Sequence, residues 1–205
     1  MYRALISRLF LTAPLLVAAC GTASPLANAS KSPAASPSAS ASATAAPIAT
    51  ASPVATQAPC DTSASGKGTV GQATITDVRV ASHSDYDRIV FEFGGRGGPA
   101  GVPSYEIKTA ARPIMRDPSG LPLVIAGDPV FGIILRGGTK QSLEGTSTYG
   151  GATDFKTGYP MLRELAEGGD FEAIATWYAG LSKAGCVHAS VLADPARLVI
   201  DLSHR

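Results

Sequence analysis

Three cysteines and three histidines are the side chains best suited to metal or nucleophilic chemistry: Cys20, Cys60, Cys186, His83, His188 and His204. None of the histidines has the spacing from a cysteine or another histidine that tetrahedral zinc sites use. The sequence has no Gly-x-Ser-x-Gly nucleophile elbow, and Asp170 and Glu172 are expected at a turn and its strand rather than as an acid–base pair. A cluster of acidic residues at 77, 85 and 87 lacks the spacing of an EF-hand calcium loop. We therefore expect no catalytic residue, no metal ion and no cofactor.

Cys20 is the one cysteine whose surroundings indicate a specific reaction. Arg3 and Arg8 precede an apolar run of about 11 residues at 9–19, and small residues lead into Cys20-Gly21. The run is shorter than the ~20 residues that span a bilayer as a helix. The segment resembles the lipobox of bacterial lipoproteins, which implies that 1–19 are a signal peptide that is removed. The resemblance further implies a palmitate-type lipid anchor on Cys20; the alternative is an ordinary cleaved signal peptide.

The remaining cysteines, Cys60 and Cys186, form an even pair if Cys20 carries lipid. An exported protein meets an oxidising compartment, in which two such thiols pair. We therefore predict a Cys60–Cys186 disulfide that clips the start of the folded part to a strand near its end. Two separate free thiols are the alternative.

Residues 20–67 are predicted to be a disordered tether. They consist almost wholly of Ala, Ser, Pro and Thr, and Lys31 is the only charged residue between Cys20 and Asp61. Such a segment has too few large apolar side chains to offset its ordering entropy. Recurrent prolines stiffen it, so its ~3.1 Å per residue allows a reach on the order of 140 Å.

Residues 68–205 have the size of one domain, which reads as mainly β. All 16 acidic residues lie beyond residue 60 with 14 of the 17 basic ones, so the folded part carries a net charge near −2. No basic run interleaved with aromatics is present, which argues against nucleic acid as a partner.

Short apolar or alternating runs separated by Gly, Pro and Asp predict strands near 73–81, 87–93, 103–109, 122–126, 129–136, 171–179, 186–192 and 197–202. Residues 137–158 are expected to be irregular, and a short helix is expected over 160–167, with a strand as the alternative.

Two of these strands share one pattern. Residues 88–93 and 197–202 each read Arg, aliphatic, Val, apolar, acid, apolar. If the two strands are neighbours, an antiparallel pairing sets Arg88 beside Asp201 and Glu92 beside Arg197. A parallel pairing would oppose the two arginines, so we predict an antiparallel arrangement.

Several segments together resemble one family. The closing Pro195-Ala196-Arg197-Leu198-Val199-Ile200-Asp201 is similar to the final strand of AMIN-type domains, and further matches to the AMIN-like domain of bacterial lipoproteins fall at 76–80, 86–93, 117–120, 126–128, 149–150 and 169–177. The resemblance implies an antiparallel β-sandwich or open barrel of about eight strands over 68–205. It also implies a location in the cell envelope without known catalysis. AMIN domains proper are similar to modules that bind peptidoglycan or localise envelope proteins.

The resemblance carries no site residues, so candidates come from the long 137–159 segment. Tyr149, Phe155 and Tyr159 are aromatics in or near an expected loop, where they would form a binding surface or cover one end of the sandwich. We predict a non-catalytic module, lipid-anchored at the extracytoplasmic face of the membrane, that binds peptidoglycan, another envelope glycan or an envelope protein. The alternative is a lipoprotein that holds an apolar small molecule in an enclosed cavity between its sheets.

Overall fold

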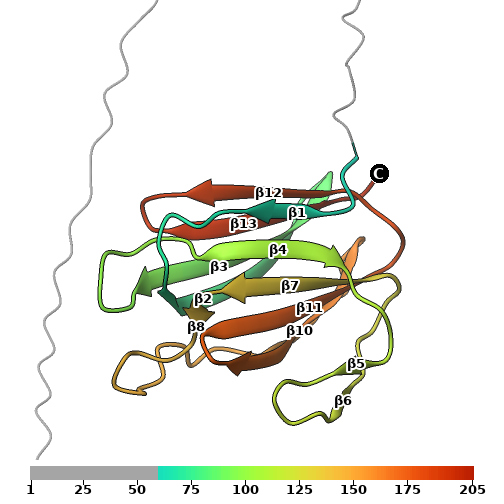
Figure 1. Cartoon of the computed structure of the whole chain (residues 1–205). Coiled ribbons are helices and arrows are strands. Elements are labelled where there is room, and N and C mark those ends of the chain that lie inside the picture. Colours follow the sequence, from blue (N-terminus) through green and yellow to red (C-terminus); the bar gives the residue numbers. More distant parts are fainter. Residues whose placement is uncertain (1–59) are drawn as a thin grey trace, which may run out of the picture. The chain divides into compact units, whose positions relative to one another are not determined.

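A computed structural model describes residues 60–205, which belong to the structural unit Val54–Arg205 (Figure 1). The predicted signal peptide, Cys20 and the tether as far as residue 59 lie outside the described residues. None of the described residues is helical, and the all-β fold class is confirmed. The strands are β1 (Ala64–Gly66), β2 (Ala73–Ser82), β3 (Tyr86–Gly95), β4 (Ser104–Thr109), β5 (Ile114–Met115), β6 (Pro122–Leu123), β7 (Val130–Arg136), β8 (Gly138–Thr139), β9 (Asp154–Lys156), β10 (Leu162–Phe171), β11 (Ile174–Leu181), β12 (Val187–Leu192) and β13 (Arg197–Ser203).

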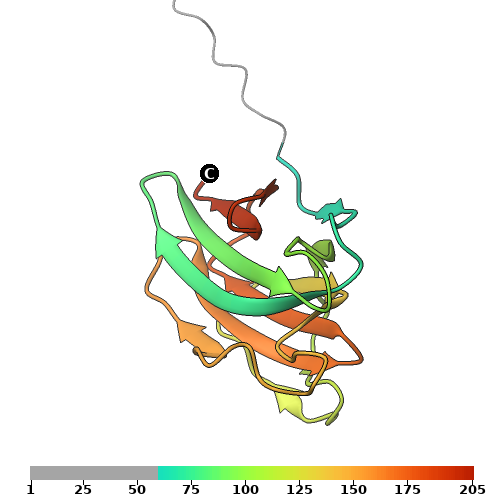
Figure 2. The same ribbon diagram turned by 90° about the vertical axis from the view of Figure 1, so that its left-hand side faces the viewer.

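The strands form two large sheets and a hairpin. The first sheet has six strands in the order β1-β4-β7-β11-β10-β9, and the second has five in the order β12-β13-β3-β2-β8. Strands β5 and β6 pair only with each other. All named pairings are antiparallel except that of β2 with β8. Figure 2 shows the long β2 and β3 (green) curving strongly, which closes the second sheet over the first.

The main core lies between the inner faces of the two sheets. In β3, Ile89, Phe91 and Phe93 alternate with more exposed residues, and all three are buried. This is the pattern of a strand with one face toward a core. Phe91 meets Trp177 of β11 edge to face, with ring centroids 5.6 Å apart. The aromatic pair therefore joins the centres of the two sheets.

A second, smaller cluster lies on the outer face of the six-stranded sheet. Ile114 and Leu123 of the β5–β6 hairpin pack there with Ile125, Val130 and Ala166. The hairpin therefore covers part of β10 on the side away from the main core.

The helix expected over 160–167 is wrong, because these residues lead into and form β10. Two irregularities shift the register of β10 against β11, one between Leu162 and Glu164 and one between Glu167 and Gly169. Each bulge turns the next side chain to the other face. With Leu165 in the main core and Ala166 under the hairpin, apolar residues at 161, 162, 165 and 166 imitate helical spacing.

Smaller differences concern element ends. The turn expected at Gly169-Asp170 lies at Glu172–Ala173, where φ is 51° and 57°, so the strand expected over 171–179 is β11 at 174–181. The strand expected over 122–126 is reduced to β6. The 137–158 segment, expected to be irregular, contains the short strands β8 and β9.

The antiparallel pairing of β3 with β13 is confirmed, with Val90 opposite Val199. Arg88 donates two hydrogen bonds to the Asp201 carboxylate, at 2.7 and 2.8 Å. Glu92 lies opposite Arg197 in register, as expected, but the two side chains form no ion pair. The Glu92 carboxylate accepts from Arg79 of β2 at 2.9 Å, and Arg197 donates to the Pro195 carbonyl.

The Cys60–Cys186 disulfide is confirmed. It joins Cα atoms 4.8 Å apart across a sequence separation of 126 residues. Beside it, the amide of Val187 donates to the Asp61 carbonyl at 2.7 Å. The start of the described chain is thus fixed to the first residues of β12.

Candidate functional site

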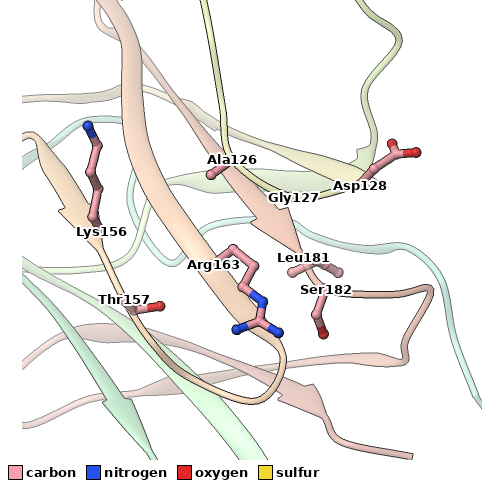
Figure 3. Close-up of a pocket in the computed structure, with 8 residues that line it drawn as sticks. All are labelled: Ala126, Gly127, Asp128, Lys156, Thr157, Arg163, Leu181 and Ser182. Atoms are coloured by element: carbon pink, nitrogen blue, oxygen red, sulfur yellow. The ribbon is translucent and has the colours of Figure 1, made fainter.

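An open groove of about 680 Å³ lies where four separate segments meet (Figure 3). The loop after the β5–β6 hairpin forms one wall, β9 and the residue after it form the other, and β10 and the end of β11 complete it. Its lining residues are Ala126, Gly127, Asp128, Lys156, Thr157, Arg163, Leu181 and Ser182. Figure 3 shows the Arg163 guanidinium between Thr157 and Ser182, with Lys156 and Asp128 toward opposite ends.

Backbone contacts fix the wall that Gly127 belongs to. Gly127 has a φ of +97°, and a Cβ at this position would lie 2.4 Å from the Leu181 carbonyl oxygen. The same carbonyl accepts from the amide of Asp128 at 2.7 Å. On the other side, the amide of Ala126 donates to the carboxylate of the buried Glu164 at 2.7 Å. Only glycine allows this close approach, so the groove wall depends on that residue type.

Two hydroxyl groups of the lining have their hydrogens already in use. Thr157 Oγ1 donates to the Leu162 carbonyl, and Ser182 Oγ donates to the Pro160 carbonyl at 2.6 Å. A hydroxyl that donates inward still offers oxygen lone pairs outward. Both residues therefore present hydrogen-bond acceptors to a ligand in the groove.

Arg163 supplies the donors. Its side chain is exposed, and within residues 60–205 its guanidinium takes part in no ion pair. Lys156 has Asp154 at 3.7 Å, but both side chains are largely exposed, so water screens that pair strongly. An unpaired guanidinium offers a planar set of donors that matches carboxylate and phosphate oxygens.

This combination suits the binding of a polar ligand. The lining offers a guanidinium, an ammonium, a carboxylate and two hydroxyl groups from separate segments. The groove can donate to an anionic group through Arg163 and accept from hydroxyl or amide hydrogens through Thr157 and Ser182. It would therefore hold a ligand that carries both kinds of group.

The three aromatics predicted as a binding surface lie against the core. Tyr149 is 7% exposed and its hydroxyl donates to the Ala152 carbonyl at 2.6 Å. Burial, together with the charges of Asp77 and Glu167, raises its pKa. Phe155 and Tyr159 are half-buried and pack on the core, Phe155 with its ring centroid 6.5 Å from that of Trp177. This arrangement agrees with a cover over one end of the sandwich, while a binding role for their exposed edges stays a prediction.

The groove lies next to the segment singled out from the sequence, but the sequence did not predict the groove residues. Lys156 and Thr157 lie between Phe155 and Tyr159, within the segment singled out from the sequence. Arg163 fell in the expected helix, and Asp128 and Ser182 belong to distant segments. No local motif joins them, because the groove forms only when β10 pairs with both β9 and β11.

A second polar cluster surrounds Asp87, which is fully buried. Its carboxylate accepts hydrogen bonds from Ser82, His204 and the amides of Met161 and Leu162. Burial alone raises the pKa of Asp87, but the hydrogen bonds outweigh it, so the pKa lies below its ordinary value. All of these partners are protein groups, which gives Asp87 a structural role.

Other acidic side chains are likewise engaged. Asp77 accepts from its neighbour Arg79 and from the amide of Val78, and Asp85 accepts from Ser84. Within residues 60–205 no three His, Cys, Asp or Glu side chains gather as a metal site. The same stretch also contains no helix with the length and apolar character needed to cross a bilayer.

Comparison with known proteins gives one result. No curated protein and no solved structure matches the chain. A family model, that of the AMIN-like domain, matches residues 73–204, a span that begins with β2 and ends just beyond β13. The match covers more than half of the sequence and includes every lining residue of the groove, and the chain therefore belongs to the AMIN-like domain family.

Proposed function

We propose that this protein is a lipid-anchored envelope protein whose AMIN-like domain binds a cell-wall polymer, with peptidoglycan as the first candidate. The observation that carries the proposal is the groove around Arg163, in which an unpaired guanidinium lies between two acceptor hydroxyls. The family assignment supports an envelope role without catalysis.

The chemistry of the groove fits the chemistry of the wall. Peptidoglycan strands carry sugar hydroxyls, amides and peptide carboxylates at close intervals. A carboxylate would accept from Arg163 in a charge-assisted hydrogen bond, the stronger kind. Hydroxyl or amide hydrogens would donate to Thr157 and Ser182, which have no hydrogens left to give.

The anchor would place the domain where this polymer is. In our proposal, the exported chain begins at a lipidated Cys20, at the extracytoplasmic face of the membrane. Because Cys60 is held by the disulfide, the tether of this proposal comprises residues 21–59, and at ~3.1 Å each these would let the domain reach on the order of 120 Å from that face.

The alternative, an apolar ligand between the sheets, has less support. It requires an enclosed apolar cavity, whereas Trp177, Phe91 and Leu135 at the centre of the core are fully buried and pack in one cluster. The groove around Arg163 is open to solvent, and charged and hydroxyl side chains form part of its lining.

The test is retention by purified cell-wall sacculi. The chain from residue 20 onward, carrying Cys20→Ser, should be retained, and Arg163→Gln should weaken retention at least tenfold, because a hydrogen bond to a charged group contributes about 1.5–3 kcal/mol. Arg136→Gln is the matched control, since it removes the same charge from an exposed arginine. Arg136 is the last residue of β7, whereas the groove wall lies just before the first residue of that strand. Wall-binding in the groove would be refuted if the parent chain is not retained, or if Arg163→Gln is retained equally well.

A further inference from the structure

The outward face of the β5–β6 hairpin is apolar. Ile114 and Leu123 point inward and are buried, while Met115, Leu121 and Val124 are 45%, 62% and 84% exposed. Pro122, which pairs with Met115, is also exposed. A hairpin with one face on the protein ordinarily turns polar side chains to water, and this hairpin does not.

Arginines border this apolar face. Arg112 donates to the carbonyls of Ile125 and Gly127, and Arg116 donates to the carbonyl of Glu167. Carbonyl oxygens position a guanidinium but do not neutralise its charge. Asp117 is the only acidic residue between 112 and 125, so the segment is net positive although the described part of the chain is net negative.

The hairpin cannot bury these side chains by folding back. Its inner face is already packed on the outer face of the six-stranded sheet. The amide of Asp117 donates to the Gly168 carbonyl at 2.8 Å, and Arg116 bonds the adjoining Glu167 carbonyl at 2.8 Å. Both links hold the hairpin against β10, so only something outside the domain can cover Met115, Leu121 and Val124.

We propose that the β5–β6 hairpin is a second membrane contact, which docks on an anionic lipid bilayer. Met115, Leu121 and Val124 enter the boundary between headgroups and acyl chains, and Arg112 and Arg116 lie at the level of the lipid phosphates. Interfacial amphipathic helices bind membranes with the same combination, an apolar face bordered by Lys and Arg. Of the proposed function, only the lipid anchor bears on this inference.

A bilayer fits this face better than a protein partner does. Stable protein interfaces use about 20–30 residues a side, far more than the hairpin offers. A weak contact is enough for a bilayer when the domain is already tethered to it, because the tether raises the effective concentration of the surface. The charge of the arginines complements anionic headgroups.

The first test uses vesicles that contain no cell wall. The chain from residue 20 onward with Cys20→Ser should associate with vesicles of equal parts phosphatidylglycerol and phosphatidylcholine, and less with phosphatidylcholine alone. Leu121→Ser combined with Val124→Ser should weaken association by about tenfold or more, and Arg116→Gln by about fivefold. Leu143→Ser is the matched control, since Leu143 is 61% exposed on another loop, and it should change nothing.

A second measurement locates the contact. A polarity-sensitive dye on Leu121→Cys should shift to the blue when anionic vesicles are added, and the same dye on Leu143→Cys should not. Equal shifts at both sites, or no vesicle association by the parent chain, would overturn the proposal. The proposal would also be overturned if a photo-crosslinker at position 121 became linked to one envelope protein and the dye showed no shift when vesicles were added. Because vesicles lack wall and sacculi lack lipid, failure of wall binding and failure of membrane docking are distinguishable.

Discussion

Oδ1 of Asp87 lies 3.0 Å from Nε2 of His204, and the other ring nitrogen of His204 lies 3.2 Å from the carbonyl oxygen of Ser84. Each ring nitrogen of His204 therefore faces an oxygen acceptor. Asp87 also accepts from the amides of Met161 and Leu162, each at 2.7 Å. One buried carboxylate of the second sheet therefore ties together the start of β10 and the C-terminal end of the chain.

Asp87→Asn should destabilise the domain by about 2–4 kcal/mol. The amide has one acceptor oxygen for several donors and leaves buried N–H groups unpaired, which is the costly case. Urea denaturation at neutral pH measures the loss. Asp85→Asn is the control, since Asp85 is exposed and its carboxylate accepts only from its neighbour Ser84. An equal loss for both variants would contradict the role given to Asp87.

The stability of the domain should fall in acid, in part through Asp87. Its folded pKa lies below the ordinary value of 3.8, so the unfolded chain takes up the proton more readily than the folded one. The stabilisation is therefore complete above the unfolded pKa of about 3.9 and is lost as pH falls through the folded pKa. Denaturation midpoints measured from pH 7 downward should drop below about pH 5, and the drop should be smaller for Asp87→Asn.

Removing the disulfide should lower stability by about 5 kcal/mol if it acts by restricting the unfolded chain, because the loop it closes spans 126 residues. The double variant Cys60→Ser with Cys186→Ser should show the loss without reductant, and the parent chain should show it only with reductant. Thermal unfolding of the two proteins, with and without reductant, makes the comparison. If reductant also lowered the unfolding temperature of the double variant, the effect of reductant could not be assigned to this disulfide.

Glu92 should couple to Arg79 and not to Arg197. The Arg79 guanidinium lies 2.9 Å from Glu92, whereas Arg197 is turned to the Pro195 carbonyl. Double-mutant cycles with alanine should give about 0.2–1 kcal/mol for Glu92 with Arg79, the range of exposed pairs. For Glu92 with Arg197 the coupling free energy should be close to zero. A larger coupling of Glu92 with Arg197 than with Arg79 would contradict this prediction.

Substitutions in the turn between β10 and β11 should increase the stability of the domain. Glu172 and Ala173 both have positive φ, 51° and 57°, as the central residues of a two-residue hairpin turn. Asn and Gly adopt this conformation at lower cost. Glu172→Asn combined with Ala173→Gly should raise the free energy of unfolding by about 1 kcal/mol or more, whereas Ala193→Gly, at a turn residue without positive φ, should not.

The elements that the sequence predicted well are those whose signal is local. In β3, alternation of Ile89, Phe91 and Phe93 with polar neighbours identifies the strand, and the shared pattern of 88–93 and 197–202 is enough to give its pairing with β13. Where a strand is buried on both faces and bulged, as in β10, alternation is lost and the pattern imitates a helix.

The candidate site could not be predicted in the same way. Arg163, Ser182 and Gly127 are far apart in sequence and meet only through strand pairing and one close backbone approach. The exposed apolar face of the hairpin could not be predicted either, for a different reason. An apolar residue in a sequence does not show whether it faces a core or solvent, and only the packing of Ile114 and Leu123 shows that Met115, Leu121 and Val124 are left outside.

The position of the disulfide also determines how the domain carries mechanical load. Tension applied to the chain before Cys60 passes through a covalent bond to Cys186 and on to β12, whose six residues pair with β13. Strand β1, three residues paired with β4, lies outside this path and is spared from being peeled off its sheet. With the disulfide reduced, the same tension would fall first on β1, so oxidation determines whether the domain resists pulling from its N-terminal side at a covalent link or at a three-residue strand.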